Sequence, residues 1–372
     1  ILMGQVLLRA GGSEFFTDLA MATMGRRRGG AAKISVMASA LFGTISGAAV
    51  SNVVVTGVVT IPLMRDSGYK ATHAGAIEAI ASTGGQMMPP IMGAAAFLMA
   101  ETLEILYAEI VIAALVPSIL YYFAAYIQVD LIAARDDISA VNQKIPRLGK
   151  VLREGWYFIP PFAVLIYMLF WANQPAAVAA VWAAGLLIIS GAIFSYKGRR
   201  IRLPDLYEIL AETGLVTISL IMIVAAAGLV IGVLNMTGLG LALPTALISI
   251  AGDNLAILLI IAAVVCIVLG MGMPTTAVYI LLSALIAPAI VEAGVDEIPA
   301  HMFILYFGMM SMITPPIALA AFAAATLTKA DPMATGFVAM RFGWTAYVVP
   351  FLFVIAPTLL LLGDDNMRIA ID

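Results

Sequence analysis

Residues 81–93, ASTGGQMMPPIMG, place two glycines and two prolines beside oxygen-bearing side chains in an otherwise apolar run. A glycine costs a helix interior about 1 kcal/mol and a proline about 3 kcal/mol, so this segment should interrupt a helix. An interrupted helix exposes carbonyl oxygens that bind hard cations and half-helix N-termini that suit anions. The segment therefore predicts ion or substrate coordination by Thr83, Gly84, Gly85 and Gln86.

A second segment of this kind occupies residues 308–322, GMMSMITPPIALAAF. Its proline pair follows the first pair at an offset of 315 − 89 = 226 residues, without a gap. The same offset pairs Pro62 with Pro288, Gly68 with Gly294 and Ala74 with Ala300. The chain thus contains an internal repeat, and Ser311 and Thr314 are candidate coordinating residues of its second copy.

Each copy also contains a tip of small and polar residues between two apolar arms. The first tip is GTISGAAVSN, residues 43–52, and the second is LGMGMPTT, residues 269–276. Small residues also permit close helix packing and methionine often fills cores, so both interpretations stay open. The candidate coordinating residues are Ser46, Gly47, Ser51 and Asn52 in the first tip and Gly272, Met273, Pro274, Thr275 and Thr276 in the second.

The arms beside the tips are short. A helical arm of about a dozen residues is about 18 Å long, which is less than the roughly 30 Å hydrocarbon core. We therefore expect each pair of arms to form a re-entrant hairpin, followed by a long helix broken near its middle. Broken backbone at membrane depth is tolerated only where protein buries it or where it lines a water-filled cavity, so the breaks indicate a binding site.

The composition indicates a membrane protein. The chain is 63% hydrophobic and 11% charged, with a mean hydropathy of +1.05, whereas soluble domains have about 25% charged residues. The net charge of −3 argues against a nucleic-acid partner. The predicted membrane spans are residues 108–128, 156–172, 176–196, 209–235 and 345–362.

The placement of charge predicts the orientation. The loops at 130–154 and 197–202 are rich in Lys and Arg and should be cytoplasmic, whereas the turn at 173–175 has neither. Counting spans puts the turn at 65–70 inside and the segment 292–297, which contains carboxylates but no Lys or Arg, outside. The two copies would then form an inverted repeat, which is typical of secondary transporters.

Isolated ionisable residues suggest further roles. Glu78 is an intramembrane carboxylate and hence a candidate for coupling, although it could also cap a pocket edge or pair with a partner helix. His73 and His301 are candidates for a proton relay, and Cys266 is interpreted as core filler. No nucleophile elbow, metal-spaced cluster or phosphate-binding loop occurs, which argues against an enzyme and an organic cofactor and favours an ion gradient as the energy source.

These repeat motifs closely resemble the large membrane subunit of tripartite ATP-independent periplasmic (TRAP) transporters. The resemblance covers about residues 4–362 and is closest to the fused-permease branch that works with TAXI-type receptors. It implies an all-α polytopic membrane protein of the elevator-type ion transporter fold, with two inverted repeats, each containing a re-entrant hairpin and a broken transmembrane helix.

The resemblance also implies bound Na⁺ between the tips and the breaks. The dicarboxylate branch of the family often has an aspartate where this chain has Asn52, so no charged ligand is carried over to that position. The residues carried over are Ser46, Gly47 and Asn52 with Gly84, Gly85 and Gln86 in one half, and Gly272, Pro274 and Thr275 with Ser311, Thr314 and Pro315 in the other.

The implied function is sodium-coupled, secondary active import of organic acids such as dicarboxylates, keto acids or amino acids. The implied partners are a TAXI-type periplasmic solute-binding protein, a small four-helix membrane subunit fused upstream and the lipid bilayer, in a bacterial or archaeal cytoplasmic membrane. Because the sequence opens on Ile1 in mid-helix, we expect an N-terminally truncated piece of a longer chain.

We expect five regions along the chain. Residues 1–33 would contain the end of a preceding helix and an interfacial amphipathic segment, and 34–128 the first transport repeat. Residues 129–242 would contain a cytoplasmic loop and scaffold helices, 243–330 the second transport repeat, and 331–372 a C-terminal transmembrane helix and tail.

Two other functions remain open. One is a receptor-independent, sodium- or proton-coupled carboxylate carrier of similar architecture. The other is an ion channel, which could also use re-entrant loops but needs a continuous pore.

Overall fold

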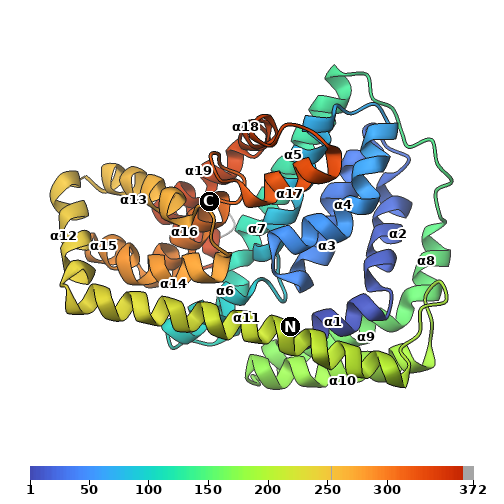
Figure 1. The fold of residues 1–372 in the computed structure, drawn as a ribbon, viewed down its shortest axis with the longest axis horizontal. Coiled ribbons are helices and arrows are strands. Elements are labelled where there is room, and N and C mark those ends of the chain that lie inside the picture. The colour runs from blue at the N-terminus through green and yellow to red at the C-terminus, as the bar shows by residue number, and fades with distance from the viewer. Residues whose placement is uncertain (253, 363–372) are drawn as a thin grey trace.

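The computed structural model describes residues 1–252 and 254–362, and these form a helical protein (Figure 1). Within them, the only β pairing is a bridge between Tyr196 and Arg199. The helices before the long loop at 136–147 are α1 Leu2–Arg9, α2 Gly12–Met24, α3 Gly30–Ser46, α4 Ala49–Asp66, α5 Ala71–Gly84, α6 Ala94–Thr102 and α7 Tyr107–Arg135.

After that loop come the helices α8 Leu148–Gly155, α9 Ile159–Phe170, α10 Ala176–Ile193, α11 Leu203–Met236, α12 Leu239–Ala251, α13 Leu255–Gly270, α14 Thr275–Leu285, α15 Ala287–Glu292, α16 Glu297–Met310, α17 Leu319–Thr328, α18 Pro332–Phe342 and α19 Trp344–Ile355. Short 3₁₀ turns cover Gly85–Met87, Trp156–Phe158 and Pro357–Leu360. The fold is therefore all-α, as the sequence predicts.

Three described helices, α7, α10 and α11, are long and apolar enough to cross a membrane. They correspond to the predicted spans at 108–128, 176–196 and 209–235. The predicted span at 156–172 is shorter, because the prolines at 160 and 161 restrict the start of α9 and leave a helix of 12 residues. The span predicted at 345–362 corresponds mainly to α19. Helices α18 and α19 are long and apolar enough to span a membrane only if they are taken together, and they meet at a bend of 44°. The predicted tail at 363–372 lies outside the described residues.

The two repeat copies show a similar order of elements. Arms α3 and α4 flank the first tip, and α13 and α14 flank the second. Helix α5 follows α4 directly, whereas the short helix α15 stands between α14 and α16; α5 and α16 are interrupted before α6 and α17. The prediction of arms of about a dozen residues is wrong for α3, α4 and α13, which have 17, 18 and 16 residues, and holds for α14, which has 11. The longer arms arise because helix-compatible residues continue past the apolar runs, as in Gly30–Lys33 and Arg65–Asp66.

The helix that follows each break packs against the other copy. Helix α17 lies against α4 and α5 of the first copy, and α6 lies against α14 of the second. Figure 1 shows the second copy on the left and the first copy on the upper right, with α11 extended beneath both. Helix α11 contacts α1, α12 and α14.

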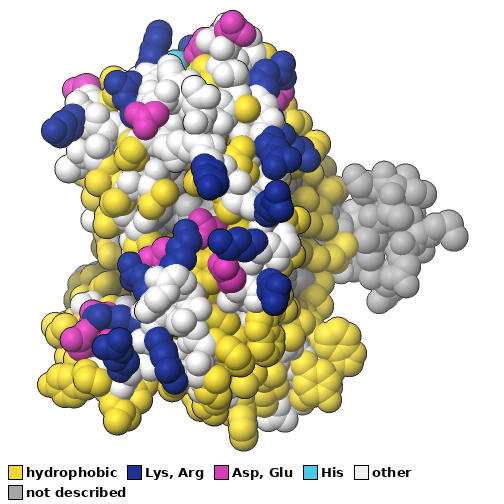
Figure 2. All heavy atoms as spheres, turned by 90° about the vertical axis from the view of Figure 1, so that its right-hand side faces the viewer, with side chains coloured by type: hydrophobic (Ala, Val, Ile, Leu, Met, Phe, Trp, Pro, Cys, Tyr) yellow, Lys and Arg dark blue, Asp and Glu magenta, His cyan; other side chains and the backbone are white. Residues whose placement is uncertain are grey.

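Basic side chains gather on one face. Figure 2, which views the right-hand side of Figure 1, shows many Lys and Arg side chains interspersed with Asp and Glu. The opposite end in Figure 1 is built from α12, α13 and α15, which belong to a stretch from 203 to 328 that contains no Lys or Arg. The basic face and the end without Lys or Arg therefore lie on opposite sides of the molecule, and the orientation predicted from the loops stays a prediction.

The first hairpin and the break touch through glycines. A Cβ atom on Gly43 of α3 would lie 2.4 Å from the Cα of Gly85, and one on Gly47 would lie 3.0 Å from the Cα of Gly93. Backbone stands in the way at both places, so no side-chain rotation can relieve the clash. Gly47 also has a φ of 60°, which favours glycine.

We expect Gly43→Ala to destabilise the folded protein by about 1–3 kcal/mol, the usual cost of overpacking, because the methyl group would push α3 away from the break. The measurement is the thermal unfolding midpoint in detergent. The matched control is Gly185→Ala, since a Cβ atom at position 185 of α10 meets nothing within 4 Å. A Gly43→Ala midpoint equal to or above that of the control would contradict this packing.

Candidate functional site

The first tip is a tight turn with a buried hydroxyl. Helix α3 ends at Ser46, Gly47 reverses the chain and α4 begins at Ala49. The Oγ of Ser46 is buried and has no hydrogen-bond partner among the described residues. The Ser51 side chain is exposed on α4. The tip therefore offers one free buried oxygen, that of Ser46.

Asn52 is fully buried and joins three helices. Its Nδ2 donates to the Ser39 carbonyl of α3 at 2.9 Å and lies 3.4 Å from the Ser82 carbonyl of α5. Its Oδ1 is 3.3 Å from the Thr56 hydroxyl on the next turn of α4. The amide thus holds both hairpin arms against the last turn of α5.

Side chains from α7 satisfy the backbone where α5 ends. The Tyr121 hydroxyl donates to the Ile80 carbonyl at 2.7 Å, and the Tyr122 hydroxyl donates to the Ala81 carbonyl at 2.8 Å. Together with Asn52, they supply partners to three successive carbonyls, at positions 80, 81 and 82. A Cβ atom on Gly84 would clash with the Tyr121 ring at 2.2 Å, so glycine is required for this approach.

The remaining residues of the first break differ in whether their polar side-chain atoms have hydrogen-bond partners. Thr83 donates to the carbonyl of Ala79 within its own helix, at 2.8 Å. The Gln86 side chain is 4% exposed, and its Nε2 has no partner in the described chain. The Gln86 carbonyl accepts from the Gly93 N–H at 2.7 Å, which closes the irregular segment back on itself. Among the candidate coordinating residues of this half, Gln86 and Ser46 are therefore the two whose side chains have free buried polar atoms.

The second tip and break are joined in the same way. Gly272 turns the chain with a φ of 78°, and α14 begins at Thr275. The Ser311 hydroxyl lies 2.9 Å from the Gly270 carbonyl and 2.6 Å from the Gly308 carbonyl, so it links the hairpin to the break. Thr275 is 9% exposed, and its hydroxyl makes no hydrogen bond within the described residues.

Thr314 lies beside Tyr347 of α19, with 2.7 Å between the two hydroxyl oxygens, and 2.6 Å from the Met310 carbonyl. The other predicted residues of this half are less enclosed: Met273, Thr276 and Pro315 are half-buried, and Pro274 is exposed. Among the residues that the structure describes, no hydrogen bond connects this cluster with the first one. The structure therefore brings the predicted residues together as two clusters, one in each repeat copy.

Glu78 is fully buried, and its carboxylate lies among five hydroxyl groups from three helices. The oxygen–oxygen distances run from 2.5 to 3.1 Å. The hydroxyls belong to Ser35, Ser39, Thr56, Thr60 and Ser82, and we call this group the hydroxyl cage. Apart from Glu78 itself, the sequence analysis missed it.

A sequence signal for the hydroxyl cage exists. Its members occur as three pairs at i and i+4, a spacing that places both side chains on one face of a helix. The pairs are Ser35 with Ser39, Thr56 with Thr60, and Glu78 with Ser82. Polar pairs with this spacing in apolar helices would have indicated that α3, α4 and α5 share a polar interface.

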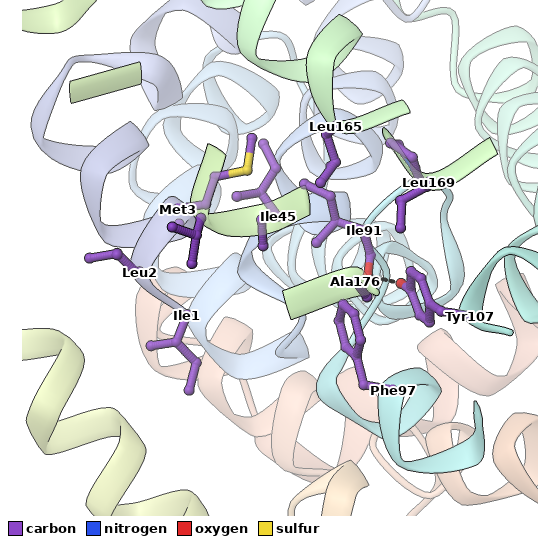
Figure 3. A pocket seen from close by; sticks show the side chains of 14 residues that line it. Ile1, Leu2, Met3, Ile45, Ile91, Phe97, Tyr107, Leu165, Leu169 and Ala176 are labelled. Carbon is purple, nitrogen blue, oxygen red and sulfur yellow. Dashed lines mark hydrogen bonds between the residues drawn. The ribbon is translucent and has the colours of Figure 1, made fainter. Parts of the chain in front are cut away.

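A cavity borders the first tip on its apolar side. It has a volume of about 170 Å³ and is lined by Ile45, Ile91 and Phe97 of the first repeat and by residues of α1, α9 and α10 (Figure 3). The Tyr107 hydroxyl donates to the Ile91 carbonyl at its edge. Its lining contains no charged side chain, so this cavity is not the oxygen-lined cluster predicted to bind ions.

We expect Asn52→Ala to lower the free energy of unfolding by about 1–3 kcal/mol, because the buried carbonyls of Ser39 and Ser82 would lose their shared donor. The thermal unfolding midpoint measures this loss. Val54→Ala is the control, since Val54 lies on the same helix but is 48% exposed. Equal midpoints for the two variants would show that Asn52 does not hold the arms to α5.

Comparison with known proteins identifies the family whose sequence pattern the chain follows. Residues 1–364 match the family described as "Tripartite ATP-independent periplasmic transporter, DctM component". The chain is 26% identical to the C4-dicarboxylate TRAP transporter large permease protein DctM of Pseudomonas aeruginosa, covering 95% of this chain and 82% of that protein.

Two further relatives carry other substrate names. The 2,3-diketo-L-gulonate TRAP transporter large permease protein YiaN of Escherichia coli is 24% identical, with 85% of this chain and 73% of that protein covered. The sialic acid TRAP transporter permease protein SiaT of Haemophilus influenzae is 25% identical, with 97% and 56% covered. All three relatives are named as transporter permeases, and none as an enzyme.

Proposed function

Since this chain belongs to the DctM family of tripartite ATP-independent periplasmic transporters, we propose that it is the sodium-coupled permease of an organic-acid importer. Its family membership makes it an integral membrane protein that works with a periplasmic substrate-binding protein. The single observation that carries the proposal is the pair of clusters in which each hairpin tip meets a broken helix. Small oxygen-bearing groups at discontinuous helices are the usual ion and substrate sites of secondary transporters.

Free polar atoms at these clusters support sodium as the coupling ion. The Ser46 and Thr275 hydroxyls lie at the two tips and have no hydrogen-bond partner in the described chain. Neither cluster contains a carboxylate, and neutral oxygens suit a monovalent hard cation. The candidate ligands remain Ser46, Gly47, Ser51, Asn52, Thr83, Gly84, Gly85 and Gln86 in the first half and Gly272, Met273, Pro274, Thr275, Thr276, Ser311, Thr314 and Pro315 in the second.

The distribution of ion pairs supports an elevator-type movement. One group joins α1 and α2 to residues 197–212: Arg9 with Glu208 and Glu212, Asp18 with Lys197, and Glu14 with Arg199. Another joins the start of α3 to α7, where Lys33 and Arg28 bind Asp130. Among the described residues, no ion pair connects one group to the other.

We assign the first group to a fixed scaffold, with α9 to α11, and the second to the moving part. The contact between them at the cavity in Figure 3 is aliphatic and aromatic. Such a contact breaks few directional bonds when one part slides along the other. The moving part would carry the substrate between the two tips across a bacterial or archaeal cytoplasmic membrane.

The names of the relatives support an organic-acid substrate, since C4-dicarboxylate, diketo-gulonate and sialic acid are all acids. The low coverage of the sialic acid permease, 56%, is compatible with a longer protein in which a small membrane subunit is fused upstream. We propose the same arrangement here, with a TAXI-type receptor as the delivering protein.

Uptake of labelled organic acids into proteoliposomes tests this function. The full-length permease would be reconstituted with its receptor outside and an inward sodium gradient. We expect uptake to fall to background when either the receptor or the gradient is removed. Uptake without the receptor would instead favour a receptor-independent carrier, and non-saturable flux would favour a channel.

We expect Thr275→Ala to weaken sodium binding, with the sodium concentration that half-maximally raises the unfolding midpoint increasing on the order of tenfold. Loss of one bond to a charged group is worth about 1.5–3 kcal/mol, and about 1.4 kcal/mol corresponds to a factor of ten. The midpoint is measured across a sodium titration, with choline keeping the ionic strength constant.

The matched control is Thr326→Ala on α17, since Thr326 is exposed and bonds only to a carbonyl of its own helix. If Thr275→Ala and Thr326→Ala require the same sodium concentration, Thr275 is not a ligand.

A further inference from the structure

Glu78 lies at the centre of the interface between α3, α4 and α5, with no part of its side chain exposed. An ionised carboxylate buried in an apolar medium needs either a counter-charge or a full set of hydrogen-bond donors. Among the described residues, no Lys, Arg or His pairs with Glu78. The hydroxyl cage is therefore what compensates its charge.

The hydroxyls of the cage differ in whether they have a second hydrogen-bond acceptor besides Glu78. Within the described part of the chain, the hydroxyls of Ser35 and Ser82 have no acceptor other than the Glu78 carboxylate, at 2.7 Å and 3.1 Å. Each hydroxyl carries a single hydrogen and can accept as well as donate. These two groups therefore serve only as donors to an acceptor at position 78.

Thr56 and Thr60 have a second acceptor each. The Thr56 Oγ1 is 2.5 Å from Glu78 and 2.7 Å from the Asn52 carbonyl. The Thr60 Oγ1 is 2.5 Å from Glu78 and 3.0 Å from the Thr56 carbonyl. When either hydrogen turns to the backbone carbonyl, the hydroxyl oxygen presents a lone pair to Glu78.

The hydroxyl cage can thus satisfy both protonation states of one carboxyl group without moving a heavy atom. In the ionised state, the five hydroxyls donate to the two carboxylate oxygens. In the protonated state, the carboxylic O–H donates to Thr56 or Thr60, whose own hydrogen then bonds to the Asn52 or Thr56 carbonyl. Donors alone would suffice if the group were always ionised.

We propose that Glu78 is a proton-binding site of the transport cycle, in addition to the ion clusters at the tips. The proton comes from water on one side of the membrane and is released to water when the cycle exposes the group. Since Glu78 is fully buried here, exchange requires the hairpin arms α3 and α4 to separate from α5. Proton binding would thereby be linked to the position of the first hairpin.

The charged and titratable groups of the elements packed against α5 are engaged elsewhere or lie near helix ends. On α3, Lys33 pairs with Asp130 of α7. On α4, Arg65 donates to the Tyr69 carbonyl, and Asp66 is exposed. His73 of α5 lies against Phe342, and α18 contributes Arg341. Helix α7 also carries Tyr107, Glu109, Tyr121, Tyr122, Tyr126 and Arg135, of which Arg135 pairs with Asp136. Helix α17 has none.

Infrared difference spectroscopy of the full-length transporter in lipid tests the proposal, because a protonated carboxyl group has its own C=O band. Spectra are recorded through a pH titration, and neither receptor nor substrate is needed, so the outcome is independent of the proposed sodium-coupled import. We expect a protonated-carboxyl band in the wild type that is lost in Glu78→Gln. Glu104→Gln, at an exposed position in the turn that follows α6, should retain the band.

A second variant covers the case in which Glu78→Gln does not fold. Ser82→Ala removes one hydrogen bond to the carboxyl group and should shift the frequency of the band, because among the described residues the Ser82 hydroxyl bonds to Glu78 alone. A band unchanged in both Glu78→Gln and Ser82→Ala, or no pH-dependent band in the wild type, would overturn the proposal.

Discussion

The structure depends on one constraint, that backbone N–H and C=O groups in an apolar interior must find partners. A continuous helix meets it by itself, whereas a helix interrupted at membrane depth leaves groups at the break unpaired. In the first copy, the carbonyls at the end of α5 accept hydrogen bonds from the side chains of Tyr121, Tyr122 and Asn52. In the second copy, Ser311 reaches the Gly270 carbonyl, and the Ala320 N–H returns to the Met312 carbonyl. The hydrogen bonds to the backbone groups of each break therefore fix the positions of the helices around it.

This constraint also explains the choice of small residues. Two backbones can share polar groups only if they approach closely, and Gly43 and Gly85 permit the closest contact of the first copy. Hydroxyls and amides then provide the remaining bonds without bringing a full charge into the apolar region. Glu78 is the exception, and it is surrounded by more hydroxyl groups than any other side chain of the described structure.

Much of this arrangement could be predicted from the sequence because it arises from local chemistry. Glycine and proline pairs determine where a helix stops, so the breaks after Gly84 and Met310 and the turns at Gly47 and Gly272 were predicted. Arm lengths were not, because hydropathy marks where apolar residues end and not where a helix does. The hydroxyl cage was missed because its members are far apart in the chain and meet only through packing. Ser51 was named as a candidate coordinating residue because it is a serine in the first tip, whereas the exposure of its side chain depends on the rotation of α4 about its axis.

Helix α11 has a consequence for how the protein sits among lipids. Its 34 residues correspond to about 51 Å of helix, well beyond the roughly 30 Å hydrocarbon thickness. All of its residues except Ile209 and Ala227 are at least partly exposed, from its contact with α1 to its contact with α14. Such a mismatch is relieved by tilt or by a locally thicker bilayer, each at a modest cost per ångström. Acyl-chain length would therefore act on α11 as a mechanical variable and alter the angle at which it connects the two repeats.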